Sequence, residues 1–277
     1  MTHPLHGKKI PVLDHGHVML VDHMGDDSAI VQAARASTGK GTKSPEKDRQ
    51  LIRYMLRNRH TSPFEMVEFK FHARMPIFVA RQWVRHRTAN INERSGRYSE
   101  LEHEAYVPET LRVQDKVNKQ GSNEAELDNE VAIKRCMKND QELLFQRYSD
   151  NLESGVAKEL ARINLPLSTY TEWYWKIDLH NLFHFLSLRM HPHAQWEFQQ
   201  YAKAMYEHFV KPIVPVACEA FEDFVLNAVR FSAQEVRVVR ALIEGQILIG
   251  TVENALARSE LSKKEQEELL QKLQLDA

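Results

Sequence analysis

Residues 67–74 alternate between apolar and polar side chains, with Val, Phe, Phe and Ala at every second position. An alternation of period two that includes aromatic residues predicts a β-strand with one buried face. Residues 169–175 are rich in Thr, Tyr and Trp, which favour strands, so a second strand is predicted there.

Two helices are predicted near the start of the chain. Asp26 and Asp27 suit the beginning of a short helix that ends near residue 37. Ser44 offers an N-cap and Pro45 suits the first helical position of a helix that reaches about residue 58. Between the two helices, residues 38–44 are rich in Gly, Lys and Thr. A nucleotide phosphate loop needs Ser or Thr after its Gly-Lys pair, and here a glycine follows, so we expect a polar loop.

Helical signals dominate the rest of the chain. Pro76 is expected to open a helix that reaches into Arg85-His86-Arg87. Residues 122–153 are polar, with eight acids against four bases, and predict a solvated helical insertion. An apolar stripe at helical spacing follows Asp178. The stripe consists of Leu179, Leu182, Phe183, Leu186 and Met190.

Together these elements predict an α+β fold, with an antiparallel or mixed sheet flanked by helices, because strands and helices do not alternate as in a doubly wound sheet. Two capping boxes, Ser232-x-x-Glu235 and Ser262-x-x-Glu265, open further helices in a C-terminal extension over residues 210–277. No interdomain linker is evident, so residues 1–277 are expected to form a single domain.

Charge and composition exclude several classes of protein. The 37 basic and 38 acidic residues give a net charge of −1, which argues against a surface for nucleic-acid polymers or membranes. No apolar run is long enough to span a bilayer, and the N-terminus lacks the core of a signal peptide. Two distant cysteines, Cys136 and Cys218, cannot form a disulfide framework. We expect a soluble cytoplasmic protein.

The near-neutral total conceals one basic segment. Residues 81–98 contain five arginines and one glutamate, a local charge of +4 by count. Arg81 and Arg85 share a helix face without an acid between them, a repulsion that a bound anion would relieve. Ser95-Gly96-Arg97 adds a hydroxyl, a close backbone approach and a guanidinium fork suited to phosphate. An anion site is as compatible with this pattern as its alternatives, which are a solvated basic patch or arginines paired with acids of residues 122–153.

The same segment resembles the signature of the flavin-dependent thymidylate synthases. It has Arg85-His86-Arg87, seven residues, then Ser95, followed by Gly96-Arg97-Tyr98. Two further segments fit the family: residues 59–65, which read Arg-His-Thr-Ser-Pro-Phe-Glu, and a C-terminal half with Arg162-x-x-Leu-Pro, Leu-Arg189 and residues 193–197. The resemblance spans residues 26–206 in order.

The resemblance implies reductive methylation of dUMP to dTMP. The carbon donor would be 5,10-methylenetetrahydrofolate, and NADPH would supply reducing equivalents through FAD, which passes a hydride to the pyrimidine ring. It also implies a homotetramer whose active sites lie where subunits meet.

Site residues follow from the resemblance by position. The residues expected around dUMP are Gln82, Arg85, Glu93, Ser95, Gly96, Arg97, Arg162 and Arg189. Those expected at FAD and the folate are His60, Ser62, Arg85, His86, Arg87, Asn92, Glu93, Asp178, His180 and His184. Arg189 would be the catalytic residue, a fixed cation that favours loss of the uracil N3 proton. Ser95 is assigned to substrate binding, since no Ser-His-Asp pattern would activate it.

Three positions depart from the family pattern. Many members have Asn, Arg and Asn where this chain has Asp178, His180 and His184. A carboxylate would repel flavin phosphates, so Asp178 is expected to cap the following helix. The departures leave open a non-catalytic nucleotide-binding homologue as an alternative. The two histidines, one helical turn apart, leave a metal-dependent hydrolase as a distant third, although no metal is expected.

Overall fold

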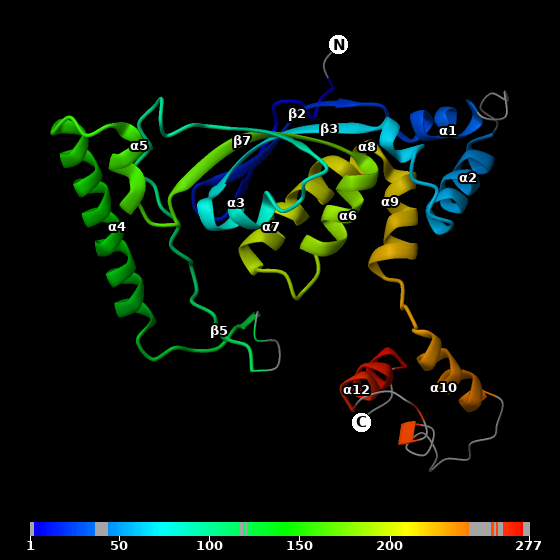
Figure 1. Cartoon of the computed structure of the whole chain (residues 1–277). Coiled ribbons are helices and arrows are strands. Elements are labelled where there is room, and N and C mark those ends of the chain that lie inside the picture. Colours follow the sequence, from blue (N-terminus) through cyan, green and yellow to red (C-terminus); the bar gives the residue numbers. More distant parts are fainter. Residues whose placement is uncertain are drawn as a thin grey trace. The chain divides into compact units, whose positions relative to one another are not determined.

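In the computed structural model, residues 3–36, 44–116, 119, 121–243, 256–257, 259 and 263–273 are described. The expected loop at residues 38–44 lies outside them except for Ser44. The chain divides into two compact units, Met1–Leu226 and Asn227–Ala277, and each is considered by itself. The larger unit is an antiparallel sheet with helices (Figure 1).

The five strands of the main sheet are arranged in the order β1-β2-β3-β7-β4, and every neighbouring pair is antiparallel. Their bounds are β1 Lys9–Val12, β2 Gly16–Met24, β3 Glu68–Pro76, β4 Asn90–Glu93 and β7 Tyr170–Asp178. A short hairpin pairs β5 Val113–Gln114 with β6 Ser122–Asn123. The α+β prediction is confirmed, as are both predicted strands.

One face of the sheet carries the core. On β3, Phe69, Phe71, Ala73 and Met75 are all fully buried, whereas the residues between them are half-buried. Three helices lie against this face (Figure 1), namely α3 Ile77–Trp83, α6 Leu179–Arg189 and α7 Trp196–Met205. A one-sided sheet of this kind is typical of antiparallel architecture, in which no crossover helix has to cover the second face.

The helices of the larger unit complete the core and its two ends. At one end lie α1 Asp27–Ala36, α2 Pro45–Arg57, η1 Phe64–Met66 and α9 Pro215–Phe221. Against the sheet lie α3 Ile77–Trp83, α6 Leu179–Arg189 and α7 Trp196–Met205. The remainder are α4 Glu130–Glu153, α5 Lys158–Ala161, η2 Arg162–Asn164, α8 Lys211–Ile213 and the π-helical turns η3 Tyr206–Val210 and η4 Glu222–Leu226.

The helix predicted to reach residues 85–87 ends earlier. α3 stops at Trp83, and the amides of Arg85 and His86 bond to the carbonyls three residues before them in a tightened last turn. Trp83 is fully buried between Trp173 and Trp175 of β7, which anchors the end of the helix at the sheet. The chain can then leave the helix and run back as β4 beside β7.

The predicted insertion is helical only from Glu130, since Ser122–Asn123 form β6, whereas the apolar stripe follows the prediction. Most of α4 is exposed, and its two buried residues, Phe145 and Tyr148, pack on the His103 ring. On α6 the stripe residues from Leu179 to Leu186 are buried and Met190 packs at the edge of the core.

The smaller unit contains α10 Ala233–Ile243 and α12 Lys263–Lys272. The first capping box is present, since Ser232 N donates to Glu235 Oε2 (2.6 Å) and Glu235 N donates to Ser232 Oγ (3.2 Å). Ser262 of the second box lies outside the described residues. Among the described helices, none is long and apolar enough to cross a membrane.

Candidate functional site

The ends of α3 and α6 bring His86 and Arg189 together. Arg189 Nε donates a hydrogen bond to His86 Nε2 (2.9 Å), and the guanidinium lies 4.9 Å from the centre of the Phe198 ring. In the described part of the chain no carboxylate lies within ion-pair distance of Arg189. Burial lowers the pKa of Arg189 from its usual value. A half-buried cation without a counter-charge is costly unless an anion arrives to pair with it.

The protonation state of His86 follows from this contact. Burial, together with the neighbouring Arg189 and His184, lowers the pKa of His86 to about 4. The ring is therefore neutral near pH 7, and Nε2 has a lone pair that can accept from Arg189. We assign its proton to Nδ1 from this hydrogen bond. Neutral His86 orients Arg189 without competing with it for an anion.

A chain of polar side chains fixes Gln82, one helical turn before His86. Gln82 Nε2 donates to Gln195 Oε1, and Gln195 Nε2 donates to Glu197 Oε2 (3.0 Å). Glu197 is 3% exposed and is also bound by Arg112 and by the Tyr106 hydroxyl. Gln195 and Glu197 were not assigned from the sequence, although both lie in the segment at residues 193–197 that resembles the family.

Ser95, Gly96 and Arg97 form a turn beside Arg162. A Cβ atom placed on Gly96 would lie 3.1 Å from Arg162 Nη1, so a side chain there would force Arg162 to shift. The Arg97 amide donates to Ser95 Oγ (3.3 Å), and Arg97 Nε donates to Glu159 Oε2 (3.0 Å). Within the described residues Ser95 contacts no histidine or acid that could act as a base.

Asn92 and Glu93 are exposed on β4, the edge strand. Glu93 Oε1 accepts a hydrogen bond from Thr171 Oγ1 of the neighbouring strand (2.7 Å), which fixes one oxygen of the carboxylate. Glu93 lies opposite the buried Trp173 and Asn92 opposite the exposed Tyr174, so Glu93 is on the face of the sheet that carries the core and Asn92 is on the other face.

His60 and Ser62 lie in the exposed loop between α2 and η1. The His60 ring contacts Tyr54 edge-on at 5.7 Å, and Arg59 before it has a φ of +58°, uncommon for a residue with a side chain. Phe64 of η1 packs against Phe183 of α6, with ring centres 6.5 Å apart. The loop is thereby held beside the N-terminal half of α6.

The N-terminus of α6 explains one departure from the family pattern. Asp178 is the N-cap and its two oxygens accept from Asn181 N (2.9 Å) and Asn181 Nδ2 (2.7 Å). The cap expected from the sequence is confirmed, and the carboxylate is directed into its own helix. His184 lies farther along α6, with its ring 6.3 Å from that of His86. Neither His180 nor His184 belongs to the group of potential metal ligands found among the described residues.

The basic segment divides into paired and unpaired arginines. Arg94 pairs with Glu102 and Glu172, and Arg97 pairs with Glu159. In the described part of the chain Arg81, Arg85 and Arg87 have no carboxylate partner. None of the observed pairs involves residues 122–153, so the alternative that the insertion neutralises this segment is wrong.

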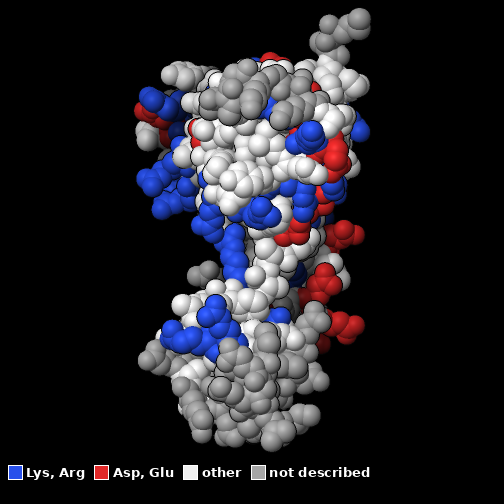
Figure 2. Space-filling model, turned by 90° about the vertical axis from the view of Figure 1, so that its right-hand side faces the viewer, with Lys and Arg blue, Asp and Glu red and all other residues white. Residues whose placement is uncertain are grey.

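Charged side chains are also unevenly distributed on the surface. On the side of the larger unit near α1, α2 and α9, Lys and Arg gather along one margin while most visible acids lie elsewhere (Figure 2). A net charge of −1 is therefore compatible with local areas of strongly positive potential.

The predicted residues fall into four groups within one chain. Arg189, His86 and His184 form one, with Gln82 one helical turn before His86 and bound to Gln195. Ser95, Gly96, Arg97 and Arg162 form a second, Glu93 and Asn92 a third, and His60 and Ser62 a fourth. Among the described residues, no side-chain hydrogen bond or ion pair joins one group to another. Arg85, Arg87 and His180 make no side-chain contact, in the part of the chain that is described, that would assign them to a group.

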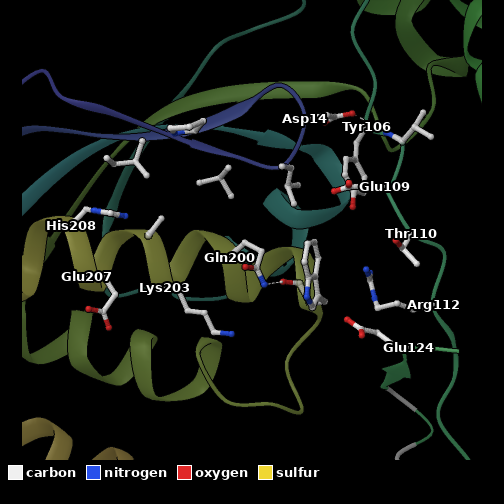
Figure 3. Close-up of a pocket in the computed structure, with 17 residues that line it drawn as sticks. Asp14, Tyr106, Glu109, Thr110, Arg112, Glu124, Gln200, Lys203, Glu207 and His208 are labelled. Atoms are coloured by element: carbon white, nitrogen blue, oxygen red, sulfur yellow. Dashed lines mark hydrogen bonds between the residues drawn. The ribbon is translucent and has the colours of Figure 1, made fainter.

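A hollow of about 880 Å³ lies elsewhere on the larger unit. Figure 3 shows Gln200 and Lys203 of α7 on one side of it and Arg112 and Glu124 on the other. None of the site residues expected from the sequence lines this hollow.

Comparison with known proteins identifies the family. The family model described as "Thymidylate synthase complementing protein" matches residues 19–216, slightly more than the span expected from the motifs. A flavin-dependent thymidylate synthase of Treponema denticola is 55% identical over 245 residues, covering 86% of this chain and 91% of that protein. One from Thermus thermophilus is 54% identical over 264 residues, covering 95% of each.

Solved structures agree with these relatives. The UMP/dUMP methylase PolB from Streptomyces cacaoi, solved with 5-Br UMP, has a TM-score of 0.71 and 36% identity over 79% of this chain and 99% of that chain. Its complex with 5-Br dUMP has a TM-score of 0.72 at the same identity, over 78% and 99%. With its residues 19–216 matched and more than half of its aligned residues identical to those of these synthases, the chain belongs to the flavin-dependent thymidylate synthase family.

Proposed function

We propose that the Arg189–His86 pair, with Arg85 and Arg87, which have no carboxylate partner among the described residues, forms the site where this flavin-dependent thymidylate synthase methylates dUMP. The family makes dTMP with FAD as cofactor and with 5,10-methylenetetrahydrofolate and NADPH as co-substrates. The observation that carries the assignment is Arg189, a partly buried cation without a carboxylate partner among the described residues and held by a neutral histidine.

The substrate assignment rests on chemistry that suits a nucleotide monophosphate. PolB, a structural neighbour, was solved with uracil nucleotides, which supports dUMP as the ligand here. Guanidinium forks bind phosphate oxygens in pairs, and Gly96 leaves room for Arg162 and a close ligand. The residues proposed to surround dUMP are Gln82, Arg85, Glu93, Ser95, Gly96, Arg97, Arg162 and Arg189.

Arg189 is proposed to act on the uracil ring. Its fixed charge would stabilise the negative charge that develops when the N3 proton is lost, and His86 would keep the guanidinium oriented. Partial burial strengthens this effect, because less water screens the cation than at an exposed site. Ser95 would hold substrate and need no activation, consistent with the absence of a nearby base in the described structure.

The residues present also suit FAD. Arg85 and Arg87 offer cations free of described carboxylate partners for its diphosphate, and the Asp178 carboxylate is occupied by Asn181. The residues proposed to hold FAD and to adjoin the folate are His60, Ser62, Arg85, His86, Arg87, Asn92, Glu93, Asp178, His180 and His184. When bound, FAD supplies the redox chemistry.

We further propose that the protein works as a cytoplasmic homotetramer. The four groups of site residues have no side-chain bond between them within the described chain, and completion of the site by neighbouring subunits would unite them. Within each subunit, residues 1–277 are proposed to form one synthase domain with an extension from about residue 210.

Two measurements on the purified protein test the function. The absorption spectrum with and without dUMP should show bound flavin whose bands shift on addition of nucleotide. Tritium should be released from dUMP labelled at ring carbon 5 only when the folate donor and NADPH are both present. Colourless protein that gains no activity with added FAD would contradict the proposal. Tight dUMP binding without FAD binding by calorimetry would favour a non-catalytic nucleotide-binding homologue.

A further inference from the structure

Three histidines from the N-terminal part of the chain converge outside the site described above. One ring nitrogen from each of His3, His6 and His23 lies within 4.8 Å of the others. His6 Nε2 and His23 Nδ1 are 2.8 Å apart, and the three ring centres are separated by 4.9 to 5.7 Å. All three side chains are partly buried.

The first two histidines are placed by a turn attached to the sheet. The His6 amide donates to the His3 carbonyl (2.9 Å), and the Leu5 amide donates to His3 Nδ1 (3.3 Å). The Gly7 amide then donates to the carbonyl of Leu20 on β2 (2.9 Å), and Gly7 has the φ of +76° that glycine tolerates. Leu5 packs against the core, so the turn has a fixed position.

A bulge in β2 places the third histidine. The register with β3 shifts between Leu20 and Asp22, so that His23 lies opposite Phe69. Phe69 is a core residue, and residues directly opposite in an antiparallel pair point to the same face. The bulge adds one residue to β2 between Leu20 and Asp22. Without that residue, the alternation of side chains along the strand would put His23 on the other face of the sheet. The bulge therefore turns His23 toward the N-terminal turn, stacked on Phe69.

We propose that His3, His6 and His23 bind a divalent transition-metal ion of the Zn²⁺ class. Three imidazoles from two separate segments are a ligand set that suits zinc, and a water molecule would complete the four ligands. Tetrahedral ligands about 2.0–2.1 Å from zinc lie about 3.3 Å apart, so the His6–His23 contact would open by about 0.5 Å.

The ion would have a structural role, as a cross-link between the N-terminal turn and β2. It would replace the His6–His23 hydrogen bond and, together with the Gly7–Leu20 backbone hydrogen bond, join the N-terminal turn to β2. It would stabilise the folded protein by binding it in preference to the unfolded chain. The proposed ligands include none of the residues assigned to dUMP or FAD.

The experiment uses full-length protein expressed without a polyhistidine tag and stripped with a chelator. Zn²⁺ titrated by calorimetry should bind with one ion per chain and raise the melting temperature. Co²⁺ should give the visible absorption of a four-coordinate site. His6→Gln and His23→Gln should each weaken binding at least about 100-fold, because each removes one of the three imidazole ligands.

A matched control uses two other histidines. His191 and His193 are exposed and their rings are 4.8 Å apart, so a His191→Gln/His193→Gln variant removes a comparable pair. This variant should keep full binding. If His23→Gln does not fold, His3→Gln alone, at the end of the chain, should lower affinity while melting normally in chelator. Absence of one-to-one binding in the wild type, or its loss in the control alone, would overturn the proposal.

Discussion

Among the described residues, one side-chain hydrogen bond, to His86, orients Arg189. The guanidinium of Arg189 also lies over the Phe198 ring. Removal of the Arg189 side chain therefore loses one cation–π contact and little core packing. At the scale of residues, the effect of a substitution on catalysis can therefore be measured separately from its effect on the stability of the fold.

We expect Arg189→Ala to lower kcat about 10²- to 10³-fold, as removal of a charge-stabilising donor does elsewhere. The free energy of unfolding should change by only about 1 kcal/mol, the size of the lost cation–π contact. Steady-state kinetics and urea denaturation check the two effects. Arg189→Lys is the control that keeps charge but not the guanidinium. An unchanged kcat with a large loss of stability would show that Arg189 is structural.

Arg97 already has an exposed partner, Glu159, with which a phosphate would compete. Arg97→Lys should weaken dUMP binding about tenfold, because one ammonium cannot reproduce the bidentate fork. Glu159→Gln should leave dUMP affinity unchanged or increase it, since the competing carboxylate is neutralised. Calorimetry measures both variants, and equal affinity in Arg97→Lys and wild type would mean that Arg97 does not bind phosphate.

His86 makes stability depend on pH. Its pKa is about 4 when folded and about 6.5 in the unfolded chain, so between these values the unfolded state binds the additional proton. The contribution of His86 to stability should therefore be constant above pH 6.5 and be lost as the pH drops from 6.5 toward 4. The His86→Gln variant should lack the part of the pH dependence of stability that His86 contributes, as measured by the melting temperature at a series of pH values.

His17 provides the comparison for this experiment, because burial lowers its pKa to about 4 as well. His17→Gln should also reduce the dependence of the melting temperature on pH between 4 and 6.5, without affecting the orientation of Arg189. An unchanged pH profile in His86→Gln would contradict the assignment of a neutral, buried ring.

At the scale of elements, α6 links the two ends of the proposed site, with Asp178 as its N-cap and Arg189 as its last residue. The cap satisfies a backbone amide that helix geometry leaves without a partner. The helix also explains why an aspartate is tolerated where many family members have asparagine, because either side chain accepts from the Asn181 amide.

Asp178→Ala should lower the free energy of unfolding by about 1 kcal/mol, because the N-cap is lost. Asp178→Asn should stay close to the wild type, since the amide oxygen can still cap. Urea denaturation compares the two. Equal losses in both variants would indicate that charge at the helix terminus, rather than the hydrogen bond, is what stabilises α6.

The elements also show what the sequence could predict. β3 and the α6 stripe were found because their patterns are local and their buried faces repeat regularly. The early end of α3 depends on Trp83 packing between residues of β7, about ninety positions away, which no local pattern records. β4 was missed since it is short, polar and exposed, and its only reason to be a strand is its pairing with β7.

For the site, similarity to the family gave the residues but not their partners. The chain from Gln82 through Gln195 to Glu197 joins segments over a hundred residues apart. The convergence of His23 with the N-terminal turn depends on one bulge in β2, and bulges leave no clear signature in a single sequence.

At the scale of the whole molecule, every proposed dUMP and FAD residue lies between positions 60 and 189, inside the larger unit. The smaller unit has its own small core of Val238, Leu256 and Leu269. Because the cores are separate, each unit can have its own free energy of unfolding.

A chain ending at Leu226 should fold, bind FAD and make dTMP at a rate within a few-fold of the full chain. The reason is that the sheet, its helices and all proposed site residues remain. Flavin absorbance and tritium release measure activity, and light scattering measures the oligomeric state. A truncated protein that is colourless or changes its oligomeric state would assign the extension to assembly of the site.

The aromatic cluster around Trp83 has an optical consequence. Three of the four tryptophans, Trp83, Trp173 and Trp175, are buried together, and their indole N–H groups have no described acceptor, whereas Trp196 is 38% exposed. Fluorescence should therefore be dominated by blue-shifted emission from one apolar location, adjacent to Gln82 in sequence. Flavin absorbs in the range where such tryptophans emit. Energy transfer to bound flavin should therefore quench this emission, and the loss of tryptophan fluorescence should measure flavin occupancy.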